Sequence, residues 1–167
     1  FFASGRNVQN GNDLHTNFKI HQTKGNEWVI LTAPDGLTVI DSIFVKPCLT
    51  NQSRGRYTDG AEEWGVFTNP SPMAANNNAF ERYANTPNFS TAPGFYPSSV
   101  SVTLSTTEQN AEIYYTTDGS YPNIGSNLYT NPIDISATTV VKATTVSANA
   151  QILNSFMEYG TFFINET

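Results

Sequence analysis

The chain has 167 residues and a formal net charge of −6, a length that accommodates one ordinary domain or two small β-sandwiches. Charged residues and aromatic residues each make up 13%, and Thr, Ser, Asn and Gly are abundant, a composition typical of short strands joined by polar turns. The negative charge, the lack of a basic stretch and the lack of a long apolar run lead us to expect no nucleic-acid partner and no direct insertion into a membrane.

The first 68 residues contain several segments in which apolar residues alternate with polar ones. This period of two predicts strands around Phe18 and Ile20, over residues 27–31 and over residues 37–44. The loop before the third segment contains Asp35-Gly36, a pair that supplies the backbone conformation of a tight hairpin. We therefore predict a hairpin here, followed by a polar loop over 47–63 and a short strand over 64–67.

A segment with two prolines and a run of asparagines follows and can continue neither a strand ladder nor a helix. Pro70 and Pro72 lie near its start, and the asparagines end at Asn78. We place the first domain at residues 1–77, a linker at 78–86 and a second domain at 87–167.

The second domain again shows alternation in short segments separated by turns. Strands are predicted over 100–104, 111–116, 128–129, 133–135, 138–145 and 155–164, with Asp118-Gly119 in a turn. Such a series is typical of a small antiparallel sandwich.

The predicted fold class is all-β, with two immunoglobulin-like antiparallel β-sandwiches of which the first is incomplete at its N-terminus. A sandwich of this class needs about seven strands, and the first segment offers fewer. We expect other polypeptide to cover the sheet edges left open in it.

The first domain resembles the C-terminal part of a bacterial lamin-tail domain. The residues that carry the resemblance are Phe2 to Arg6, Leu14 to Ile20, Gly25 to Leu31, Asp35-Gly36 with Ile40-Asp41, and Gly55 to Gly60. The resemblance implies a β-sandwich without catalytic residues of its own. The sequence departs from the family pattern at Ser71-Pro72-Met73, where the glycine of the pattern is missing.

The second domain resembles the immunoglobulin-like module at the C-terminus of chitobiases and hexosaminidases. The matching segments are Pro93 to Tyr96, Ile113 to Pro122 and Ser126 to Tyr129. In secreted bacterial surface proteins, such a pair of modules is similar to the region before a CotH-like kinase domain. The resemblance therefore implies a secreted or cell-surface location in a bacterium and an accessory role in a multidomain protein.

Residues able to perform catalysis or hold a metal are few in this chain. His15, His21 and Cys48 lack the spacing of a metal or nucleophile motif, and Glu62-Glu63 would point to opposite faces of a strand. Asp118 and Asp134 could be imagined as calcium ligands, but a turn explains Asp118. We predict no catalytic residue, no cofactor site and no metal site.

Aromatic side chains are the main indication of a binding surface, because their faces can stack on sugar rings. They concentrate between residues 95 and 129, and alternation must place about half of them in the core. The candidate residues for stacking on a ligand or sugar are Tyr96, Tyr114, Tyr121 and Tyr129.

The predicted function is that of a non-catalytic structural, spacer and interaction module pair in a larger secreted bacterial cell-surface protein. Its partners would be other domains of the same polypeptide or a surface assembly. The alternative is a carbohydrate-binding accessory region of a secreted glycoside hydrolase or peptidase. These residues are not expected to form an enzyme, although the parent protein could carry a catalytic domain elsewhere.

Overall fold

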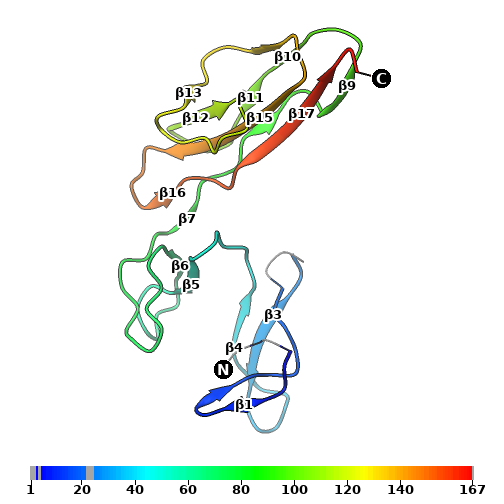
Figure 1. The fold of residues 1–167 in the computed structure, drawn as a ribbon. Coiled ribbons are helices and arrows are strands. Elements are labelled where there is room, and N and C mark those ends of the chain that lie inside the picture. Colours follow the sequence, from blue (N-terminus) through cyan, green and yellow to red (C-terminus); the bar gives the residue numbers. More distant parts are fainter. Residues whose placement is uncertain (1–2, 4, 22–24, 167) are drawn as a thin grey trace. The chain divides into compact units, whose positions relative to one another are not determined.

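The computed structural model describes residues 3, 5–21 and 25–166, and these residues form an all-β protein (Figure 1). The described residues contain strands and turns but no helix, which confirms that the fold class is all-β. None of them lies in a helix that could cross a membrane. The chain divides by packing into two compact units, residues 1–54 and 55–167, here called unit 1 and unit 2.

Unit 1 consists of two small hairpins. Strands β1 (Gln9–Asn10) and β2 (Asp13–Leu14) form the first, and β3 (Trp28–Thr32) and β4 (Val39–Phe44) form the second. The second hairpin was predicted, and its turn contains Gly36 at a φ of 69°, in the left-handed region that favours glycine. The strand predicted around Phe18 and Ile20 is wrong, because the chain bends there and Thr16 Oγ1 donates to Phe18 O.

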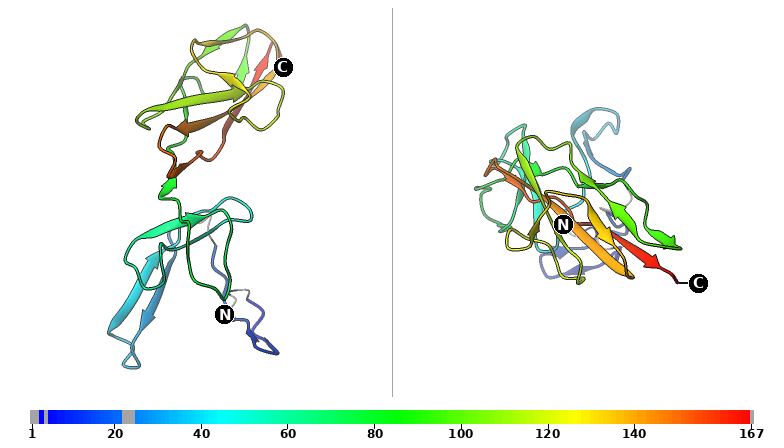
Figure 2. Two further views of the ribbon diagram at one scale, coloured as in Figure 1. Left: turned by 90° about the vertical axis from the view of Figure 1, so that its left-hand side faces the viewer. Right: turned by 90° about the horizontal axis from the view of Figure 1, so that it is seen from above.

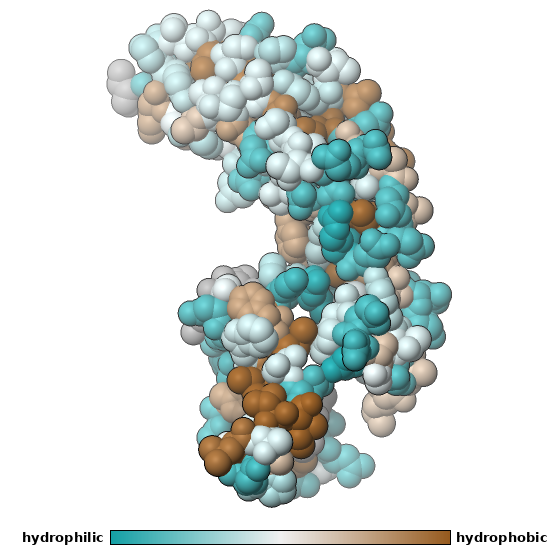
Figure 3. Space-filling model, turned by 180° about the vertical axis from the view of Figure 1, so that it is seen from behind, coloured by the Kyte–Doolittle hydropathy of each residue, from teal (hydrophilic) through white to brown (hydrophobic). Residues whose placement is uncertain are grey.

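The β3–β4 hairpin leaves most of its apolar side chains exposed to solvent. Trp28 packs edge-on against Phe44 at 5.3 Å between ring centroids, yet all five residues of β3 are exposed. Figure 3 shows a group of hydrophobic side chains on the surface of the molecule. Apolar side chains on both faces are typical of a strand that is covered on both sides. In the described structure these side chains are open to solvent, and the incompleteness of the first sandwich stays a prediction.

The turn of this hairpin holds a carboxylate with a depressed pKa. Asp35 accepts hydrogen bonds from the Thr38 hydroxyl at 2.6 Å and from the backbone N–H groups of Leu37 and Thr38 at 2.9 Å. These bonds, the hydroxyl first, lower the pKa of Asp35 from 3.8 to about 2. The carboxylate therefore supports the turn fully above pH 3.8, and this support is lost as the pH falls through about 2.

We expect the Thr38→Val variant, which keeps the shape of the side chain but loses the hydroxyl, to move the pKa of Asp35 back toward 3.8. Carbon-detected NMR titration of the Asp35 carboxyl measures this. An Asp35 that already titrates at its ordinary value in the unchanged chain would contradict the hydrogen-bonded turn.

Unit 2 is built around a five-stranded sheet with the order β13-β12-β15-β17-β9 (Figures 1 and 2). Its strands are β13 (Asn127–Leu128), β12 (Ala111–Thr116), β15 (Thr139–Ser147), β17 (Glu158–Ile164) and β9 (Gly94–Tyr96). Neighbours are antiparallel except β17 and β9, which are parallel. Two strand pairs form the opposing layer, β10 (Val100–Val102) with β14 (Ile133–Ile135) and β8 (Asn88–Phe89) with β11 (Leu104–Ser105).

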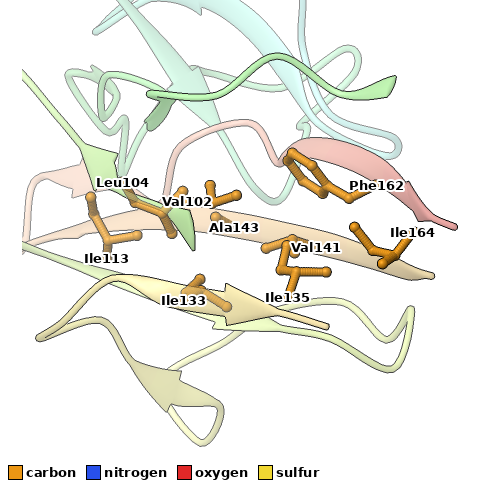
Figure 4. Packing of buried hydrophobic residues seen from close by; sticks show 9 residues of the cluster. All are labelled: Val102, Leu104, Ile113, Ile133, Ile135, Val141, Ala143, Phe162 and Ile164. Atoms are coloured by element: carbon orange, nitrogen blue, oxygen red, sulfur yellow. The ribbon is translucent and has the colours of Figure 1, made fainter. Parts of the chain in front are cut away.

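The core of unit 2 lies between these two layers (Figure 4). Val102, Leu104, Ile133 and Ile135 come from the opposing layer. The five-stranded sheet contributes Ile113, Val141, Ala143, Phe162 and Ile164. Phe162 is fully buried and lies near Phe89 and Tyr96, with ring centroids 6.3 and 6.2 Å apart. Alternation along β15 and β17 thus assigns one face of the sheet to the core and leaves the other outside.

Three of the remaining four strands lie in parts of the sequence where no strand was predicted, whereas the fourth, β6 (Trp64–Phe67), lies where the short strand over 64–67 was predicted. β5 (Ser53–Arg56), which contains the sequence boundary between units 1 and 2, and β6 form a two-stranded sheet. β7 (Arg82–Tyr83) lies within the predicted linker 78–86 and pairs in parallel with β16 (Ile152–Leu153). The two compact units do not have to coincide with the two predicted domains. The predicted domain limits of 1–77 and 87–167 therefore stay a prediction.

Candidate functional site

Two of the four candidate tyrosines contribute to the core of unit 2. Tyr96 and Tyr129 are half-buried and packed against the core cluster. The Tyr96 hydroxyl donates to Ala92 O at 2.5 Å, and Tyr129 meets Tyr115 edge-on at 6.4 Å between centroids. Their rings are engaged in packing, which leaves little of either face for a ligand.

The other two candidates, Tyr114 and Tyr121, lie on the opposite side of the five-stranded sheet. The Tyr114 hydroxyl donates to Glu112 Oε2 at 2.7 Å, and this bond raises the pKa of Tyr114. Tyr121 is 74% exposed. The structure therefore separates the four predicted residues into two pairs on different faces.

The solvent side of this sheet, which we call the outer face, is defined by the strand registers. Residues directly opposite each other on paired strands share a face, so Tyr114 lies with Leu128 on β13, Lys142 lies with Thr116 and Tyr159, and Phe163 lies with Phe95 on β9. Phe95 is 66% exposed and Tyr159 is 61% exposed.

Phe95, Tyr159 and Phe163 were not among the residues predicted to stack on a ligand. Phe95 and Phe163 form a stacked pair, with ring centroids 4.5 Å apart and planes inclined by 13°. The signal that could have found Tyr159 and Phe163 is the alternation along β17, in which Tyr159, Thr161 and Phe163 are interleaved with the buried Gly160, Phe162 and Ile164.

Lys142 occupies the middle of the outer face. Its Nζ donates to Gly119 O and lies 5.2 Å from the centroid of the Tyr121 ring, and Thr116 Oγ1 donates to Ser120 O at 2.8 Å. These contacts hold the loop after β12 against the sheet, and Tyr121 with it, while Tyr159 lies on the other side of Lys142. A cation over a ring face also contributes an attraction of about 0.5–1 kcal/mol at an exposed site.

A second feature of unit 2 is an ion pair, here called the clamp, that joins the predicted linker to the sandwich. Arg82 donates two hydrogen bonds of 2.8 Å to the carboxylate of Glu108, whose side chain is only 3% exposed. Asn85 N also donates to Glu108 Oε2 at 2.9 Å. The bond from Arg82 is the main cause that lowers the pKa of Glu108, and it raises the pKa of Arg82.

Backbone and aromatic contacts reinforce the clamp. In addition to the parallel pairing of β7 with β16, Glu81 N donates to Gln151 O and Ala84 N donates to Leu153 O, both at 2.8 Å. Tyr83 packs on Phe156 with ring centroids 4.7 Å apart. Residues 81–85 are therefore fixed to the sandwich by hydrogen bonds to Glu108 and by backbone hydrogen bonds to the segment that contains β16.

The cavities found in the part of the chain that the structure describes are open to solvent. One of about 380 Å³ is lined by Thr68, Asn69, Asn77, Asn78, Ala79, Phe80 and Gln151. Its lining lacks an ionisable side chain, so it offers hydrogen-bonding groups but no general acid or base.

The residues weighed for metal or catalytic chemistry lie apart. Within residues 3, 5–21 and 25–166, no three His, Cys, Asp or Glu side chains come close enough to hold one metal ion. His21 lies beside Glu27 with Nδ1 3.3 Å from Oε1, and Asp118 accepts from Ser120 N and Ser120 Oγ inside its turn. The predictions of no catalytic, cofactor or metal site stay predictions.

Unit 2 thus contains a two-layered, immunoglobulin-like sandwich with one packed face and one aromatic outer face. Residues 91–153 match the family model of the chitobiase/beta-hexosaminidase C-terminal domain, as the resemblance implied. No curated protein matches the chain. The matched segment contains four of the five strands of the large sheet, β9, β12, β13 and β15, and ends before β17. The similarity therefore concerns this segment of unit 2.

Proposed function

We propose that the chain is a non-catalytic structural module of a larger secreted bacterial cell-surface protein, and that unit 2 holds adjoining parts of that polypeptide in a fixed arrangement. The observation that supports this is the clamp. A free linker would leave residues 78–86 solvated, whereas Arg82, Tyr83 and Ala84 here make specific contacts with the sandwich. A bidentate ion pair fixes orientation as well as distance.

The experiment that tests this function measures a distance across the clamp within unit 2. Spin labels at Ala75→Cys and Ser98→Cys, both exposed positions, are introduced in the full chain with Cys48→Ser, and the distance distribution is recorded by double electron–electron resonance. We expect a narrow distribution, which the Glu108→Ala substitution broadens.

A distribution that is equally broad with and without Glu108 would contradict the spacer function. The matched control is Glu112→Ala, which removes an exposed carboxylate of the same sandwich and should leave the width unchanged.

We propose carbohydrate binding by an accessory region of a secreted glycoside hydrolase or peptidase as the second candidate. Two observations favour it: the family matched by residues 91–153 is named after chitobiase and beta-hexosaminidase, and the outer face of unit 2 presents exposed aromatic rings. Retention of the full chain on an insoluble polysaccharide tests this candidate.

A further inference from the structure

The outer face of unit 2 combines exposed aromatic rings in a way that packing within the chain does not explain. Phe95, Tyr121 and Tyr159 are each more than half exposed. Large aromatic side chains are usually well buried, and a set of them on one solvent-facing surface marks an interaction site. The opposite face of the same sheet already supplies the core.

We infer that this outer face binds a neutral polysaccharide chain whose sugar rings stack on Phe95, Tyr159 and Tyr121. The inference rests on the carbohydrate-binding function proposed above as the second candidate, and it assigns that function to residues other than Tyr96 and Tyr129. Sugar rings have apolar faces and hydroxyl rims, so an aromatic face and nearby polar groups recognise them together.

The spacing of the rings fits a chain rather than a single sugar. Tyr159 and Phe163 are four residues apart on β17, which places their Cα atoms about 13 Å apart at the rise of an extended strand. A stacked ring lies about 4.5–7 Å from its partner, so one sugar ring cannot contact both. The stacked Phe95–Phe163 pair lies near the C-terminal end of β17, and Tyr159 lies near its N-terminal end.

The polar groups between the rings indicate an uncharged ligand. Lys142 lies opposite Tyr159 on the neighbouring strand, and its ammonium group lies over the ring of Tyr121. Thr161 lies between Tyr159 and Phe163 along β17. The carboxylate of Asp118 interacts electrostatically with Lys142 and offsets part of its charge. Hydroxyl, ammonium and carboxylate groups can all hydrogen-bond to sugar hydroxyls without requiring a charge on the ligand.

The same polar groups disfavour a protein partner. The core of a protein–protein interface is depleted of charged residues, whereas Lys142 lies in the middle of this face.

The test is co-sedimentation of the full 167-residue chain with three insoluble neutral polysaccharides: chitin, cellulose and insoluble xylan. We expect saturable binding to at least one of them. Each of the variants Phe95→Ala and Tyr159→Ala should bind that polysaccharide about tenfold more weakly, and the double variant should not be retained. Circular dichroism melting confirms that each variant is folded.

The matched control is Phe18→Ala, which removes an exposed aromatic side chain from unit 1 and should bind like the unchanged chain. Binding that survives the double variant would overturn the assignment to the outer face while leaving the carbohydrate function in place. No binding to any of the three polysaccharides would overturn both. Light scattering that shows a dimer dissociated by Tyr159→Ala would identify the face as a contact between copies of the chain, which also overturns the inference.

Discussion

Replacing Phe162 with alanine is expected to lower the free energy of unfolding of unit 2 by about 3–5 kcal/mol. Phe162 is fully buried between the two layers and contacts the rings of Phe89 and Tyr96, so its removal leaves a cavity that the surrounding strands cannot close. Urea unfolding followed by near-ultraviolet circular dichroism measures the loss.

The control for this substitution is on the same strand. Tyr159→Ala removes an aromatic side chain of similar size from the outer face and is expected to change the free energy of unfolding by only about 0.5–1 kcal/mol. Equal losses at the two positions would mean that the faces of β17 are not divided into core and solvent sides.

Replacing Glu108 with glutamine is expected to destabilise unit 2 by about 2–3 kcal/mol at pH 7. The amide has one acceptor oxygen where the carboxylate has two, so it can accept only one of the two hydrogen bonds from Arg82. It also leaves the guanidinium without its counter-ion. Because the Arg82 side chain is 45% exposed, water screens part of this loss and keeps it below that of a fully buried pair.

The cost of Glu108→Gln should also depend on pH. The hydrogen bonds to Glu108 lower its pKa below the ordinary 4.5, so the stabilisation by the charged clamp is present above pH 4.5 and is lost as the pH falls through the lower pKa of the folded state. Unfolding measured at pH 7 and at pH 3 should show a smaller difference between the two proteins at pH 3.

A difference that stays constant between the two pH values would contradict a role for the charge of Glu108. The control Glu112→Gln removes an exposed carboxylate that bonds to Tyr114 and is expected to cost less than about 0.5 kcal/mol at pH 7.

Local sequence patterns were sufficient to predict the strands that have strong apolar alternation. The β3–β4 hairpin, β12 and β15 lie where the pattern predicted them, because their period of two is carried by several β-branched or aromatic residues. β5 reads Ser53-Arg54-Gly55-Arg56 and contains no apolar residue, so no local signal marks it. The alternation around Phe18 and Ile20 was too short to outweigh the turn at Thr16.

The candidate site was predicted only in part, for a different physical reason. Alternation divides the side chains of a strand between two faces but does not say which face another layer covers. Tyr96 and Tyr129 therefore looked equivalent to Tyr121, although the layer of β10 and β14 covers their side of the sheet. The clamp was not predicted because Arg82 and Glu108 are separated by 26 residues and meet only in the folded chain.

The parallel pairing of β9 with β17 determines how the sandwich responds to tension along the polypeptide. The chain enters β9 at Gly94 and leaves β17 at Ile164, which lie at opposite ends of the same short ladder. A pull on the two ends of the sandwich therefore loads the hydrogen bonds of this ladder together, in shear, and cannot peel them apart one at a time. A sandwich connected in this way resists stretching most strongly along the line that joins its two chain ends.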